Sequence, residues 1–109
     1  MSQFDVFPNP GKNTDAIPYV VTIQSAAFDK LDRRLVIPLL LESGAGKTVK
    51  IPLSDATPSL TVENHRVVLN PFEMVSIDAK KLKNKVASLA DHGDLIVAAL
   101  DEVFSRARG

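Results

Sequence analysis

The side chains that could do chemistry are few and scattered along this chain. It has two histidines, His65 and His92, and no cysteine, which excludes Cys-based metal sites and thiol nucleophiles. His65 could act as a general base, although a histidine in a strand is more often a packed or surface residue. Residues 91–94, around His92, match no metal-ligand spacing, and no serine has a recognisable activating partner. We therefore predict no catalytic residue, no metal site and no cofactor, and expect a protein that binds rather than an enzyme.

Residues 43–48, Ser-Gly-Ala-Gly-Lys-Thr, look at first like a phosphate-binding loop. That motif needs G-x-x-x-x-G-K-[ST], because its length lets successive backbone N–H groups wrap a phosphate. Here one residue, not four, separates Gly44 from Gly46, and an alternating segment follows where the motif requires a helix. We interpret this stretch as a loop between strands.

Charge and hydropathy narrow the class of protein further. The 13 basic and 13 acidic residues cancel, so a general nucleic-acid binder is not indicated. Four lysines in residues 80–85 could contact an anionic partner, but we expect a solvated surface stretch. The N-terminus lacks a signal-peptide pattern, and no apolar run approaches the ~20 residues of a membrane helix. We expect a cytoplasmic protein without a membrane contact.

The elements that must position these residues are mainly strands. The length predicts a single domain, residues 1–109. Residues 32–41 form a long apolar run in which Pro38 excludes a helix and predicts a sheet edge or a bulge. Glu63-Asn64 is expected to be a two-residue hairpin turn. Other strands are predicted at residues 3–7, 19–24, 60–62, 65–69 and 73–78. In the strand at 73–78, Val75 and Ile77 should face inward.

A C-terminal helix is predicted from about Asp91, which should cap it. Ile96, Leu100, Val103 and Ala107 form one apolar stripe at helical spacing. Further apolar residues widen the surface beyond the ~100° that one burial surface needs. This excess predicts that a second part of the helix surface is also buried. A second copy of the chain, in a homodimer, is the simplest way to cover it. The helix residues assigned to the core or the dimer are Leu95, Ile96, Leu100 and Val103.

Two segments of the chain, in this order of elements, resemble the CcdB family. The first is Tyr-Val-Val-Thr-Ile-Gln-Ser at residues 19–25, and the second is Arg-Arg-Leu-Val-Ile-Pro-Leu at residues 33–39. Weaker similarity continues from Val86 into the helix, so the resemblance covers nearly the whole chain. It implies an α+β, mainly β fold: an SH3-like barrel of the CcdB and MazF type, with extra strands, one C-terminal helix and a homodimer.

The resemblance also implies a function. CcdB proteins are toxins of type II toxin–antitoxin systems that trap DNA gyrase, a type II topoisomerase, by inserting the end of this helix into the gyrase A subunit dimer. A CcdA-like antitoxin neutralises them through a disordered C-terminal segment, and operator DNA is bound only through the antitoxin complex, which autoregulates transcription. The corresponding helix end here is Phe104, Ser105, Arg106 and Arg108. The best-known members continue from the phenylalanine with Trp-Gly-Ile, so the match stops at Phe104.

Two alternatives stay open. The MazF family shares this barrel, and fold does not fix function, so a ribosome-independent endoribonuclease toxin is possible. It would need an acid–base group and cationic phosphate stabilisers, for which Arg33, Arg34 and His65 are the candidates. The other alternative is a non-toxic relative that binds the antitoxin and has lost gyrase poisoning.

Overall fold

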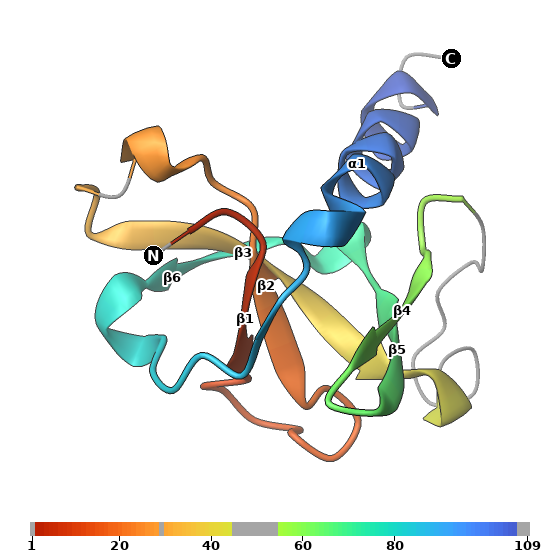
Figure 1. The fold of residues 1–109 in the computed structure, drawn as a ribbon, viewed down its shortest axis with the longest axis horizontal. Coiled ribbons are helices and arrows are strands. Elements are labelled where there is room, and N and C mark those ends of the chain that lie inside the picture. Colours follow the sequence, from red (N-terminus) through yellow and green to blue (C-terminus); the bar gives the residue numbers. More distant parts are fainter. Residues whose placement is uncertain (1, 29, 45–54, 107–109) are drawn as a thin grey trace.

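A computed structural model describes residues 2–28, 30–44 and 55–106 of the chain. Its seven strands form one antiparallel sheet that curls into a nearly closed barrel, and a single α-helix, α1 (Gly93–Arg106), follows at the C-terminal side (Figure 1). The predicted mainly β fold with one C-terminal helix is therefore confirmed. The strands are β1 (Asp5–Pro8), β2 (Tyr19–Thr22), β3 (Arg33–Leu41), β4 (Ser59–Val62), β5 (His65–Leu69), β6 (Val75–Asp78) and β7 (Ala87–Ser88).

The strand order is β4-β5-β3-β2-β1-β7, and β6 pairs with β3 outside this path. Short 3-10 helices join several strands. Those used below are η1 (Ala26–Phe28), η2 (Glu42–Gly44), η3 (Pro71–Glu73), η4 (Ala79–Lys81) and η5 (Ala90–His92). Among the described residues, no helix is long and apolar enough to cross a membrane.

The long strand β3 lies in the middle of the sheet, so the predicted sheet edge at Pro38 is wrong. On one side β3 pairs with β2, and on the other it pairs first with β6, up to Val36, and then with β5, from Leu39. Pro38 lies where β3 changes from one partner to the other, and its carbonyl accepts a hydrogen bond from Asn70 N at 3.1 Å. Because the N and O of a strand residue point to the same side, the missing proline N–H falls in the gap between β6 and β5. The sheet therefore loses no ladder bond at Pro38.

Apolar side chains cover both faces of the sheet. In β2, Tyr19 and Val21 join the main core, whereas Val20 joins a smaller cluster on the opposite face. The main core collects buried residues from five strands, from the segment after β7 and from α1. The smaller cluster consists of Phe7, Val20, Val36 and Leu82, with Ile77 packed against it.

The β4–β5 hairpin has the predicted turn. Glu63 and Asn64 have φ of 50° and 67°, and Val62 pairs with His65 across them. Positive φ at both central positions is the geometry of a type I′ turn, which matches the right-handed twist of the strands it joins. The strand after η3 fits its prediction less well. Val75 is 48% exposed rather than inward, because β6 lies at the outer side of β3, while Ile77 is half-buried.

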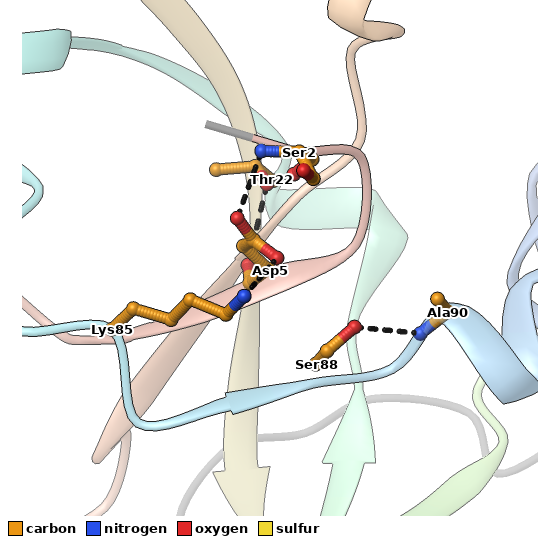
Figure 2. A network of polar contacts seen from close by, with 6 residues as sticks. All are labelled: Ser2, Asp5, Thr22, Lys85, Ser88 and Ala90. Carbon is orange, nitrogen blue, oxygen red and sulfur yellow. Dashed lines mark hydrogen bonds and ion pairs between the residues drawn. The ribbon is translucent and has the colours of Figure 1, made fainter.

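A buried polar network fixes the N-terminal segment to β1, β2 and the segment before β7 (Figure 2). Asp5, only 3% exposed, accepts a hydrogen bond from Ser2 N at 2.8 Å through Oδ2 and pairs through Oδ1 with Lys85 Nζ at 3.1 Å. Thr22 Oγ1 donates to Ser2 O at 3.1 Å. A buried carboxylate is costly unless it is paired, so Lys85 has a structural task that the other lysines of residues 80–85 do not share.

The start of the helix differs from the prediction. Asp91 lies inside η5 and is not the cap; instead Ser88 Oγ accepts a hydrogen bond from Ala90 N at 3.2 Å (Figure 2). Gly93 then begins α1 directly against the buried ring of Phe4. A Cβ at Gly93 would lie 2.7 Å from Phe4 Cε2, and Phe4 itself has a φ of 68°, uncommon for a bulky residue. Close packing therefore requires glycine here.

We predict that Gly93→Ala destabilises the protein by about 1–2 kcal/mol, because overpacking a core of this kind typically costs that much. Helix propensity alone predicts the opposite sign, a gain of about 1 kcal/mol. Urea unfolding followed by circular dichroism measures the difference. Phe4→Leu should recover much of the loss in the Gly93→Ala background. A stabilised Gly93→Ala protein would show that the Phe4 ring moves aside without cost.

Candidate target-binding surface on the C-terminal helix

The helix α1 is fixed to the barrel at its base and extends away from it (Figure 1). Ile96 and Ala99 are fully buried in the main core, and Leu100 packs partly against it. Residues three and four apart share a helix face, so these three side chains form the attachment stripe. Ile96, predicted as a core or dimer residue, is thus a core residue.

Two other parts of the helix surface are apolar and exposed. At 100° per residue, Leu95 lies on one flank of the attachment stripe and Val97 and Phe104 lie on the other. Their exposed fractions are 42%, 46% and 57%. Val97, Leu100 and Phe104 follow each other at helical spacing, and we call these three residues the α1 ridge. The predicted apolar excess over one burial surface is therefore real, and it lies on both sides of the stripe.

The residues predicted to reach a target lie at the free end of α1. Phe104 is more exposed than any other large apolar residue that the structure describes. Ser105 and Arg106 complete the last turn of the helix backbone. Arg108 lies outside the described residues, as does Ala107 of the predicted stripe. Val103 is half-buried on the side of the attachment stripe.

The candidates for an endoribonuclease centre do not come together. Arg33 and Arg34 begin β3, whereas His65 lies beside the far end of that strand, because Leu41 pairs with Val67. A strand rises about 3.3 Å per residue, so more than about 20 Å separates the arginines from the histidine.

Both arginines also have structural partners. Arg33 donates to Ser76 Oγ at 2.8 Å and to Ser76 O at 2.7 Å, which joins β3 to β6. Arg34 is buried and donates to the carbonyls of Leu31 and Arg33. Within the described residues, no three His, Asp or Glu side chains are arranged to hold a metal ion. Of the glycine-rich segment, Gly44 ends η2 and residues 45–48 lie outside the described part of the chain.

His65 belongs instead to a polar cluster that the sequence analysis missed. Tyr19 Oη donates to Glu63 Oε1 at 2.9 Å and lies 3.3 Å from His65 Nδ1. Burial raises the pKa of Tyr19 above its ordinary value of 10.0, and the hydrogen bond to Glu63 and the charge of that carboxylate raise it further. A tyrosine with a raised pKa stays protonated near neutral pH and acts as a hydrogen-bond donor, so this cluster fastens the β4–β5 turn to β2. Tyr19 lies 44 residues before Glu63 and 46 before His65, so no local pattern in the sequence brings the three together.

A nearly closed antiparallel barrel with one projecting helix defines a small protein that presents an exposed apolar helix end and has no assembled catalytic centre among its described residues. The sequence profile of the CcdB protein family matches residues 3–105, so the chain belongs to the CcdB family. Membership places it among the toxins of toxin–antitoxin systems. A search of curated proteins finds no match.

The Tyr19 cluster predicts a stability change in alkali. The folded state binds the tyrosine proton more tightly than the unfolded chain does. The contribution of Tyr19 to the free energy of unfolding is therefore complete below pH 10.0 and is lost as the pH rises above that value. The chain has one tyrosine and no tryptophan, so the ultraviolet absorbance of the phenolate reports Tyr19 alone. We expect its midpoint above 10.0 in the folded protein and a smaller shift in Glu63→Gln, in which burial still acts. An unshifted midpoint in the folded wild type would contradict the assigned burial and hydrogen bond.

Proposed function

We propose that this protein is the toxin of a type II toxin–antitoxin system that inhibits DNA gyrase by binding and not by catalysis. The observation that carries this proposal is the exposed apolar end of α1, with Phe104 at 57% exposure on a helix that stands away from the barrel. Large aromatic side chains in such positions supply most of the binding energy of protein interfaces. The target surface would be the gyrase A subunit, and the site of action the cytoplasm.

The chemistry of the contact differs from that of the aromatic-tailed members. Ser105 stands where they have tryptophan, and Arg106 and Arg108 follow. A serine cannot replace a stacked ring, whose loss typically costs about 2–4 kcal/mol. The arginines add charge attraction, which salt screens within ~8 Å at physiological ionic strength. Binding to gyrase should therefore be weaker and more sensitive to salt.

The remaining partners follow from the same proposal. A second copy of the chain would cover part of the α1 ridge and form the homodimer. A CcdA-like antitoxin would neutralise the toxin through a disordered segment, and operator DNA would be bound only by the complex of the two. Arg33, Arg34 and His65 lie apart, so no observation favours the endoribonuclease alternative. Antitoxin binding without toxicity remains a distinct outcome of the test below.

The gyrase contact predicts that Phe104→Ala lowers trapping of gyrase on cleaved DNA by about tenfold or more, because it removes the apolar anchor. Deletion of residues 105–109 should remove the salt sensitivity and most of the activity, since residues beyond a helix end rarely support a core. Leu31→Ala, an exposed apolar truncation on the β2–β3 connection, is the matched control. A cleavage assay at low and high salt measures all four proteins.

Equal trapping by wild type and Phe104→Ala would refute the assigned contact. Trapping by none of the proteins would mean that gyrase is not the target, and an RNA cleavage assay and antitoxin titration on the same samples would then identify the alternative.

The dimer predicts opposite behaviour for two neighbouring residues of α1. Val97→Asp, on the exposed ridge, should give a folded monomer in sedimentation experiments at high micromolar concentration. Ile96→Asp should instead unfold the protein, because an unpaired charge in a core costs several kcal/mol, about 3 or more. Leu31→Asp, at an exposed site outside the helix, should remain dimeric. A wild-type monomer at the same concentration would remove the dimer from the proposal.

A further inference from the structure

Exposed basic side chains from two segments far apart in the sequence meet at one corner of the barrel. Strand β6 pairs with the start of β3, where Arg33 lies opposite Asp78. Ala79 N then donates to Asp32 O at 2.8 Å, which holds η4 beside the residues that precede β3. We call the four exposed basic residues of this corner the η4 basic surface, and they are Lys30, Arg33, Lys80 and Lys81.

Two open hollows lie in the η4 basic surface. Lys30 and Lys80 line one of about 350 Å³, and Arg33 and Lys81 line the other, of about 340 Å³. Asp78 lines both, so the two hollows are neighbours. Successive residues of a 3-10 helix point about 120° apart, which is why Lys80 and Lys81 of η4 reach different hollows. Each hollow therefore has a cation from each of the two segments.

The charges of the η4 basic surface are not used up inside the protein. Its three lysines have no ion-pair partner among the residues that the structure describes. Arg33 donates to Ser76 through Nε and Nη2, and its Nη1 has no partner in the described part of the chain. Of the two carboxylates at this corner, Asp32 and Asp78, the second already accepts from Lys80 N as the cap of η4. An excess of positive charge therefore faces the solvent.

The zero net charge of the whole chain conceals a separation of charge. Residues 90–106, which form η5 and α1, contain four acidic residues and one arginine. The free end of α1 and the segment that follows β6, where η4 lies, are on opposite sides of the molecule (Figure 1). A separation of this kind attracts a polyanion to one side and repels it from the other. The η4 basic surface can therefore be occupied while the end of α1 is bound elsewhere.

We propose that the η4 basic surface binds the phosphate backbone of duplex DNA without reading its sequence. A duplex carries one negative charge per about 1.7 Å of its axis, so its phosphates can lie over both hollows at once. An extended acidic peptide offers at most one charge per residue, about 3.3 Å apart, and must be ordered on binding. Among the described residues, no aromatic side chain lines either hollow, whereas single strands are held by stacking on aromatic rings. The density of charge therefore favours the duplex.

Binding through so few phosphates is weak and depends strongly on salt. Each contact releases counterions, so the logarithm of the affinity falls with the logarithm of the salt concentration by about 0.9 per contact. Four cations predict a slope of about −3.6 and binding that is measurable only at low salt. At physiological salt the surface would strengthen a complex already held on DNA, such as the one with the antitoxin. That last step rests on the function proposed above.

Fluorescence anisotropy tests this inference, with a short labelled duplex titrated with the full chain at several low salt concentrations. Wild type should give the slope stated above, and two duplexes of unrelated sequence should bind equally. Lys80→Gln and Lys81→Gln should each weaken binding to both duplexes and reduce the slope by about one. Arg66→Gln is the charge-matched control, because it removes one exposed cation beside the far end of β3. It should leave the slope unchanged.

The outcomes separate this proposal from its competitors. In nuclear magnetic resonance, the duplex should shift the amide signals of residues 30–33 and 78–81 and not those of α1. No binding at low salt, or equal weakening by Arg66→Gln and Lys81→Gln, would overturn the proposal. So would tighter binding of a single strand of the same length, or equal binding of a polyglutamate of the same charge. Neither gyrase nor antitoxin is present, so this result does not depend on the gyrase cleavage assay.

Discussion

The change of partner along β3 is the constraint on which the rest of the fold depends. The nine-residue strand β3 pairs with three strands. It pairs with β2 along one edge, and along the other edge with β6 up to Val36 and with β5 from Leu39. Pro38 can lie in the middle of this sheet because its missing N–H falls in the gap between β6 and β5. The partner change also lets the sheet curl, since β5 and β6 leave β3 in different directions (Figure 1). The barrel and the position of η3 both follow from this exchange.

The helix depends on a second set of contacts at the opposite end of the chain. Asp5 joins the N-terminal segment to Lys85 (Figure 2). Phe4 then packs against Gly93, where α1 begins. A rigid base allows the far end of a helix to be apolar and exposed without any support of its own. Leu95, Val97 and Phe104 can therefore vary with the partner, whereas the attachment stripe of Ile96, Ala99 and Leu100 cannot.

Local pattern predicted much of this fold, and the failures have a common physical origin. The strand at residues 32–41, the Glu63-Asn64 turn and the helix near Asp91 were all found from alternation, turn chemistry and helical spacing. The edge assigned to Pro38, the inward direction of Val75 and the cap at Asp91 were wrong, because each depends on which distant segment lies alongside. The Tyr19–Glu63–His65 cluster was missed for the same reason. The scattered Arg33, Arg34 and His65 could be judged only once the register of β5 on β3 was known.

The pairing of β1 with β7 has a consequence for synthesis of the protein. Val6 is beside Ala87 in the sheet, and Phe4 contacts Gly93, so one of the first strands made is completed by one of the last. Contacts this distant in sequence are formed late, because closing so long a loop costs entropy before any contact repays it. A ribosome-bound chain that has not yet released β7 has no platform on which to hold α1. The helix surface can therefore reach any partner only after nearly the whole chain has left the ribosome.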